Sequence, residues 1–271
     1  MNYSLIFLFI FILGTVIGSF LNVVIFRLNT GLSLVHGRSK CMTCNHKLSW
    51  YELIPVFSYL FLKGKCRKCK TAISRQYITI ELLTGIIFVF IAIHFLKALL
   101  VAPSLFVFLF LIFAIIFSIL MIILVYDLRH KIIPDNLVWT FNILSFLVIF
   151  INYETAFPLF RGPSIWNFLA GPILALPFAL LFYVSKGKWM GFGDAKLMLG
   201  IGWMLGLAHG LSSMILSFWL GAIVGVLLIF FSKKKVGMKT QVPFAPFLII
   251  SALIVFLFNI DLFSLSLLFN I

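Results

Sequence analysis

Acidic side chains are scarce in this sequence: seven aspartates and glutamates stand against 21 lysines and arginines in 271 residues. Charged residues of both signs make up only 10% of the chain, and hydrophobic residues make up 63%. Soluble domains carry far more charge, so this composition excludes an ordinary soluble fold. It also makes each acidic residue a candidate for a specific role, because none is needed to solvate a surface.

The chain also lacks the features that would explain its net charge of +14 by nucleic-acid binding. No basic helix or aromatic stacking platform accompanies the charge. The lysines and arginines instead fall in short loops between apolar runs, as the positive-inside bias of membrane proteins predicts. We therefore expect membrane lipid, and no nucleic acid, around this protein.

A cleaved signal sequence is not indicated either, because no lysine or arginine precedes the first apolar run and no small-residue cleavage site ends it. Runs of about 20 apolar residues, long enough to cross a bilayer, recur from end to end. The sequence predicts an all-α polytopic membrane protein of about eight transmembrane helices. The expected spans are residues 4–26, 78–99, 104–126, 136–152, 164–184, 194–208, 211–231 and 243–268. The sixth is short, and Gly200, Gly202 and Gly206 predict a close-packed or irregular helix there.

Loop charge orients these spans. Residues 27–77 hold ten of the 21 basic residues, so this loop is expected in the cytoplasm and the N-terminus outside. Alternation then places residues 129–131, 186–188 and 233–235 in the cytoplasm as well. We expect three parts: a first transmembrane helix over 1–26, a cytoplasmic loop domain over 27–77, and a transmembrane bundle over 78–271.

All four cysteines lie in that loop, as Cys41-Met-Thr-Cys44 and Cys66-Arg-Lys-Cys69 with 21 residues between the pairs. Two CxxC pairs at such a separation predict a four-thiolate zinc ribbon. A closed four-cysteine site leaves no open coordination position, so the zinc is expected to be structural. A redox pair, or His46 in place of one thiolate, are the alternatives.

Two aspartates lie at the edges of apolar runs, where ionisable groups usually mark a functional site. Asp127 ends an out-to-in span and Asp194 begins an in-to-out span, so both are expected at the cytoplasmic face. If the fold brings them together, they form an aspartyl dyad, in which one carboxylate activates water and one carboxylic acid polarises a peptide carbonyl. No Ser-His-Asp pattern is evident. Gly191 and Gly193, just before Asp194, would admit unusual backbone angles and close approach of a substrate strand.

Other roles for these carboxylates stay open. Either aspartate could pair with a loop lysine, and Asp194 could cap its helix. Asp135, which follows Pro134, is expected to be the N-cap of the next helix. The main rival function is a proton-coupled transporter with the zinc ribbon as a cytoplasmic gate, although no clear internal repeat supports it. A non-catalytic membrane scaffold is the third possibility.

Several segments together resemble the bacterial type IV prepilin peptidases, also called prepilin leader peptidase/N-methyltransferases. They follow that family's order along nearly the whole chain. The segments are Gly18–Arg27 (GSFLNVVIFR), both CxxC pairs, Ile54–Leu60 (IPVFSYL), Ile73–Tyr77 (ISRQY), Glu81–Gly85 (ELLTG), Asp127 to Pro134-Asp135, and Gly191–Leu197 (GFGDAKL). One small departure is Met42, where the family often has proline.

The resemblance implies an aspartyl endopeptidase of the GxGD type in the bacterial cytoplasmic membrane. By position, Asp127 and Asp194 take the family's catalytic places. The implied substrates are prepilins and pseudopilins, cut after a glycine at the cytoplasmic face. The resemblance also implies methylation of the new N-terminus with S-adenosylmethionine, although the sequence contains no nucleotide-binding fingerprint.

Overall fold

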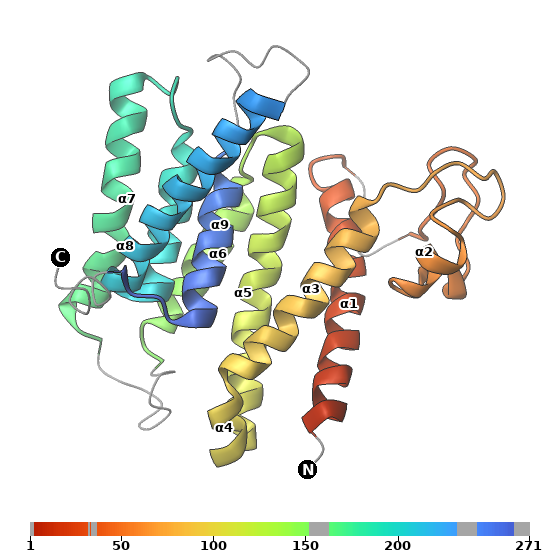
Figure 1. The fold of residues 1–271 in the computed structure, drawn as a ribbon, viewed down its shortest axis with the longest axis horizontal. Coiled ribbons are helices and arrows are strands. Elements are labelled where there is room, and N and C mark those ends of the chain that lie inside the picture. Colours follow the sequence, from red (N-terminus) through yellow and green to blue (C-terminus); the bar gives the residue numbers. More distant parts are fainter. Residues whose placement is uncertain (1–2, 32, 34–36, 152–162, 232–242, 263–271) are drawn as a thin grey trace. The chain divides into compact units, whose positions relative to one another are not determined.

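The protein is described by a computed structural model over residues 3–31, 33, 37–151, 163–231 and 243–262. Helices make up its regular structure, and the described residues form no strand (Figure 1). The elements are α1 (Tyr3–Arg27), η1 (Trp50–Leu53), α2 (Phe57–Phe61), α3 (Gln76–His94), α4 (Leu96–Val101), α5 (Pro103–His130), α6 (Asp135–Val148), α7 (Ile165–Ser185), α8 (Phe192–Phe231) and α9 (Ala245–Phe258).

Five of the described helices, α1, α3, α5, α7 and α8, are long and apolar enough to cross a membrane. The apolar helices α6 and α9 are shorter, with 14 residues each. Each of the eight expected spans overlaps one of these seven helices, and the sixth and seventh spans share α8. The last span was expected to run to residue 268, and its end lies outside the described residues. The all-α membrane class is confirmed, whereas the count of eight spans stays a prediction.

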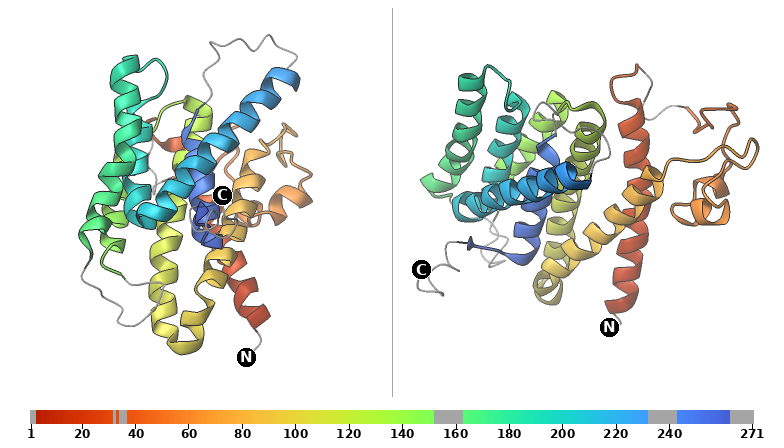
Figure 2. Two further views of the ribbon diagram at one scale, coloured as in Figure 1. Left: turned by 60° about the vertical axis from the view of Figure 1, so that its left-hand side comes forward. Right: turned by 45° about the horizontal axis from the view of Figure 1, so that its top comes forward.

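The chain forms two compact units, residues 1–122 and 123–271, with the boundary inside α5. In the first unit, α1 and α3 lie side by side in every view (Figures 1 and 2). A Cβ added at Gly14 would lie 2.7 Å from Gly85 Cα, and one added at Gly18 would lie 2.8 Å from Glu81 Cα. Only glycine permits this approach, which is the small-residue packing used by membrane helices.

The cysteine loop is held to this helix pair by a buried carboxylate. Glu81 Oε2 accepts a hydrogen bond of 2.7 Å from the backbone N–H of Val56, which directly precedes α2. Val56 has a φ of 63°, a conformation that β-branched residues rarely adopt. A second contact joins α1 to α3, because the Asn22 side chain donates to the Tyr77 carbonyl at 3.2 Å. Hydrogen bonds of polar side chains therefore join α1 to the start of α3 and join the loop to α3.

In the second unit, α8 packs against α6, α7 and α9. Its 40 residues are not one continuous rod, because Gly206 interrupts the helix with φ 77° and ψ −178°. A Cβ on Gly210 would lie 3.7 Å from Gly202 Cα, eight positions earlier, whereas eight residues of straight helix span about 12 Å. The chain therefore folds back at Gly206.

This fold-back corrects one expected boundary. The expected spans leave a loop at residues 209–210, but the break lies at Gly206 because that backbone conformation is accessible almost only to glycine. The expectation of a close-packed sixth helix is confirmed. A Cβ on Gly200 would lie 2.3 Å from Asn142 Oδ1, and one on Gly202 would lie 2.8 Å from the Ala170 carbonyl oxygen. Glycines thus fix α8 tightly against α6 and α7.

Candidate active site and metal cluster

Asp127 lies in the last turn of α5, which ends at His130. Its carbonyl accepts a 2.8 Å hydrogen bond from the backbone N–H of Lys131, whose φ of 55° ends the helix. Although it stands at a helix end, Asp127 is only 4% exposed. Its carboxylate contacts the backbone amide of Ala245, the first residue of α9. The acid is therefore enclosed and oriented by two helices of the same unit.

Asp194 lies in the first turn of α8 and is 6% exposed. Its backbone N–H donates to the Gly191 carbonyl at 3.2 Å, and its carboxylate contacts the backbone amide of Gly191. The contact at the start of the helix, which was considered above as an alternative role of Asp194, is therefore present. It satisfies one amide at the start of α8, where a negative charge is also favoured by the helix dipole.

The fold places the two aspartates close enough that the charge of Asp127 acts on Asp194, although 67 positions separate them in the sequence. In the described part of the chain, neither carboxylate forms an ion pair; Lys196, two positions after Asp194, is paired with Asp135 instead. Each carboxylate meets a backbone amide, and neither has a lysine or arginine as an ion-pair partner among the described residues. They can share a proton, which is the property that an acid–base pair needs.

Asp135 does not have the role expected from the sequence. Pro134 is the N-cap of α6, and Asp135 is the first helical residue. Its carboxylate instead accepts a 2.7 Å hydrogen bond from the Lys196 ammonium. The helix begins one residue earlier than expected, because Pro134 takes the N-cap position in an extended conformation. Lys196 lies two positions after Asp194 in α8. The pair ties the start of α6 to the start of α8.

The two glycines of the Gly-Phe-Gly-Asp segment differ in what they do. Neither has a positive φ, so the unusual backbone angles expected of them are not observed. A Cβ on Gly193 would lie 3.0 Å from both Cβ and Cδ1 of Ile133, whereas a Cβ on Gly191 would lie 3.7 Å from Asp194 Oδ2. Gly193 thus lets the segment after Asp127 approach the segment before Asp194.

This difference predicts unequal effects of two matched substitutions. Gly193→Ala should slow peptide cleavage about tenfold or more. The added methyl group and Ile133 must move apart by a few tenths of an ångström, which shifts the neighbouring Asp194, and misplacement of a catalytic group is costly. Gly191→Ala meets only ordinary van der Waals contact and should slow cleavage less than about threefold. Cleavage rates of the two purified variants in the same lipid nanodiscs measure this. Equal losses would contradict the role given to Gly193.

The four cysteines come together as the sequence predicts. Cys41, Cys44, Cys66 and Cys69 place their sulfurs within 4.8 Å of one another, and none is in a disulfide. The two CxxC turns, Cys41–Cys44 and Cys66–Cys69, are called the first and second knuckle below, and they have the same local geometry. Bridges join Lys40 to Lys47 and Lys65 to Ala72, and each first cysteine accepts a backbone hydrogen bond from the residue four positions on, at 2.9 and 3.0 Å.

The sulfur positions fit a tetrahedral ion. Cys41 and Cys69 sulfurs lie 3.8 Å apart, and Cys44 and Cys66 sulfurs lie 4.0 Å apart; four thiolates bound at about 2.3 Å would lie about 3.8 Å apart. The hydrogen bond between Cys69 and Thr71 lowers the pKa of the Cys69 thiol to about 6. Although a backbone hydrogen bond at His46 acts to lower it, the pKa of the Cys44 thiol is raised to about 11 by burial and the neighbouring thiols. His46 is not a ligand candidate, because its ring lies 3.6 Å from the Glu52 carboxylate. The cluster can therefore hold one metal ion through four sulfurs.

Sequence reasoning missed two contacts at the aspartates. The Ala245 amide beside Asp127 could have been suspected from Pro243 and Pro246, since prolines flank helix starts. The Lys196–Asp135 pair carries no local signal, because 61 positions separate the two residues and only the fold joins them.

This combination defines a class: a multi-pass membrane protein with an enclosed aspartate pair in its helical bundle and a four-cysteine loop. Comparison with known families agrees. Residues 12–95 match the family described as Bacterial Peptidase A24 N-terminal domain, and residues 114–226 match the Type IV leader peptidase family. No solved structure matches.

Individual relatives cover almost the whole chain. It is 32% identical to the prepilin leader peptidase/N-methyltransferase of Aeromonas salmonicida, over 95% of this chain and 91% of that protein. Identity to the proteins of the same name from Stutzerimonas stutzeri and Bacillus subtilis is 29% and 28%, over 92% and 94% of this chain and 89% and 95% of those proteins. The chain belongs to the type IV leader peptidase family, and is thus a multi-pass membrane enzyme. These matches do not support the rival transporter.

Proposed function

We propose that this enzyme removes the leader of type IV prepilins or pseudopilins with Asp127 and Asp194, and that it methylates the new N-terminus. The observation that carries the proposal is the enclosed aspartate pair, in which the two carboxylates act on each other rather than on a basic partner. The relatives named prepilin leader peptidase/N-methyltransferase support the choice of substrate.

The proposed reaction starts with one proton shared by the two aspartates. The ionised carboxylate removes a proton from a water molecule, and the oxygen of that water attacks the scissile carbonyl carbon. The protonated carboxyl group donates its proton to the carbonyl oxygen, which gives a neutral tetrahedral intermediate. When the C–N bond breaks, the leaving amine takes a proton from the pair. A carboxylate of the pair takes a proton from one hydroxyl of the intermediate as the C=O bond forms again, so the dyad returns to its starting state with one shared proton. We do not assign base and acid separately, because the pair titrates as a unit.

The surroundings of the aspartates suit a substrate that is part leader and part membrane helix. Asp127 ends a membrane-capable helix and Asp194 begins one, so both stand where an apolar substrate helix would reach water. We place this edge at the cytoplasmic face, on the charge of the loops. The scissile bond, after a glycine and before the apolar segment, would lie extended across the pair.

For the second activity, the N-terminal amine freed by cleavage is the nucleophile and loses a proton on methylation. S-adenosylmethionine supplies the methyl group, activated by its sulfonium charge. The four-cysteine cluster is proposed to hold zinc and to keep the loop folded, with no part in either reaction.

Product masses test this function. Full-length enzyme in nanodiscs is incubated with a prepilin-like peptide, with and without S-adenosylmethionine. We expect one cut directly after the glycine that precedes the apolar helix, and a further mass of one methyl group only when the donor is present. An intact peptide, or a cut elsewhere, would contradict the proposed function.

A further inference from the structure

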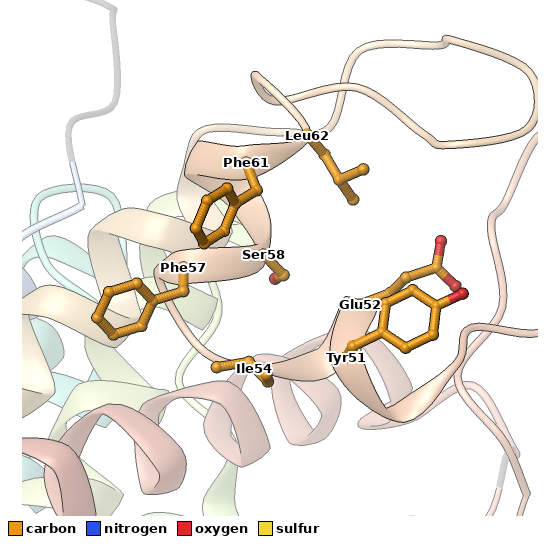
Figure 3. Close-up of a pocket in the computed structure, with 7 residues that line it drawn as sticks. All are labelled: Tyr51, Glu52, Ile54, Phe57, Ser58, Phe61 and Leu62. Carbon is orange, nitrogen blue, oxygen red and sulfur yellow. The ribbon is translucent and has the colours of Figure 1, made fainter.

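The cysteine loop carries an apolar rim that its own fold leaves open to its surroundings. Trp50 is 77% exposed, Phe57 60%, Leu60 58% and Phe61 84%; these four residues are called the aromatic rim below. Figure 3 shows the rings of Phe57 and Phe61 projecting from the same side of α2, one turn apart. Soluble surfaces rarely expose large apolar side chains side by side, so we expect the rim to contact another apolar surface.

A cavity beside the rim extends this apolar surface. It has a volume of about 280 Å³ and lies between α2 and the segment before it. Figure 3 shows Tyr51 on one side of it, with Ser58 of α2 and Leu62, the residue after α2, opposite. The lining is mostly hydrocarbon, with one carboxylate, Glu52, among it. Glu52 Oε2 accepts a 2.8 Å hydrogen bond from the Ser49 backbone N–H, and the buried Oε1 accepts none in the described part of the chain. The cavity therefore suits acyl chains or other apolar matter.

The depth of the rim follows from its attachment to α3. Val56, directly before α2, is hydrogen bonded to Glu81, which lies five positions into the membrane-capable helix α3. Five residues of helix rise about 8 Å. The polar boundary on each side of a bilayer core is about 5–8 Å thick. With the outer edge of the headgroup layer placed at the first residue of α3, the start of α2 lies level with the lipid headgroups and not out in the aqueous phase.

Charge identifies the kind of lipid. Within residues 27–77 the sole acidic residue is Glu52, which is buried. The segment after α2 exposes a row of basic residues, Lys63, Lys65, Arg67, Lys68 and Lys70. The Arg67 guanidinium lies 5.3 Å from the centre of the Tyr51 ring and is hydrogen bonded to its hydroxyl group, so basic and aromatic surfaces are joined. Aromatic side chains beside lysine and arginine are the pattern of elements that lie in an anionic membrane surface.

We propose that residues 50–70 lie on the membrane, with the aromatic rim inserted at the boundary between headgroups and acyl chains of an anionic leaflet. The basic row contacts the lipid phosphates. The surface continues the lipid-facing surface of α1 and α3, to which Val56 and Glu81 attach it. A basic leader peptide would be repelled by the basic row, which argues against it as the occupant. The proposal depends on α3 spanning the membrane and not on the peptidase reaction.

Photocrosslinking tests the proposal on the full chain. Benzoylphenylalanine is placed at Phe57, at Phe61 and, as a control, at Met42, which is 73% exposed on the first knuckle and outside the rim. The variants are reconstituted in phosphatidylglycerol nanodiscs, and their zinc content shows that the loop is intact. We expect lipid adducts at positions 57 and 61 in the intact-protein mass spectrum, several-fold more than at position 42. No adducts at 57 and 61, or equal adducts at all three positions, would overturn the proposal.

Two further arms test lipid charge and the occupant. Replacing phosphatidylglycerol by phosphatidylcholine, or Lys63, Lys65 and Lys68 by glutamine, should each lower the adduct yield at position 61 at least about threefold. An equal adduct yield at position 61 in phosphatidylglycerol and phosphatidylcholine would overturn the assignment to an anionic surface. Adducts with an added prepilin-like peptide in place of lipid would assign the rim to the substrate instead, and so would also overturn the proposal.

Discussion

Replacing either Asp127 or Asp194 by asparagine should abolish leader cleavage, with a fall in rate of at least about 10³-fold. Asparagine keeps the shape of the side chain but can neither take a proton from water nor donate one to the carbonyl oxygen. Because both acids are enclosed and act on each other, no neighbouring carboxylate can replace the one removed. Cleavage of a prepilin-like peptide by enzyme in nanodiscs measures the loss.

Asp135→Asn is the matched control for these variants. It removes a carboxylate from the same unit, but one that is bonded to Lys196 at the surface. Exposed ion pairs contribute little to stability, about 0–1 kcal/mol, so this variant should keep most of its cleavage activity. If Asp135→Asn were as inactive as the other two, the loss would reflect disturbed packing of α6 on α8 rather than proton transfer.

Replacing Cys66 by serine should abolish the zinc binding proposed for the cluster and unfold the loop. Cys66 is buried at the centre of the cluster, and structural zinc contributes about 10–16 kcal/mol in small zinc domains. Besides the Val56–Glu81 hydrogen bond, the described part of the loop has only short regular structure to hold it: two isolated β-bridges, η1 and α2. We expect zinc to fall from one ion per chain to well below one, and the loop to be cut rapidly by trypsin.

His46→Ala is the control for the cysteine variant. His46 lies beside the first knuckle but is directed at Glu52 and not at the sulfurs. Its removal should leave the zinc content at one ion per chain. Zinc loss in His46→Ala equal to that in Cys66→Ser would show that the metal is held by a different set of ligands. Full zinc content in Cys66→Ser would contradict the four-sulfur site.

Much of this architecture could be predicted because it depends on local sequence patterns. Apolar runs give the helices, and the two CxxC pairs give the knuckles, whose equal spacing produces equal turns around Asn45 and Lys70. Loop charge alone also predicts that Asp127 and Asp194 lie on one face, since the sign of each loop is a property of the sequence. These predictions need no knowledge of which helices touch.

Tertiary contacts could not be predicted in the same way. The break at Gly206 depends on a backbone angle that a glycine-rich segment permits but does not specify. The Lys196–Asp135 pair and the Ala245 amide beside Asp127 join positions that are far apart along the chain. The attachment of the cysteine loop is a further example: its charge predicts its side of the membrane, but not the hydrogen bond by which Val56 joins it to Glu81 of α3.

The central claim is that Asp127 and Asp194 act as one catalytic unit, and single-turnover cleavage tests it most directly. Rates are measured with enzyme in excess for the wild type, Asp127→Asn, Asp194→Asn and the double variant, in the same nanodiscs. Groups that act as a unit are not additive, so all three variants should be slower than the wild type by at least about 10³-fold and lie within about tenfold of one another. Either single variant keeping a tenth or more of the wild-type rate would contradict the account.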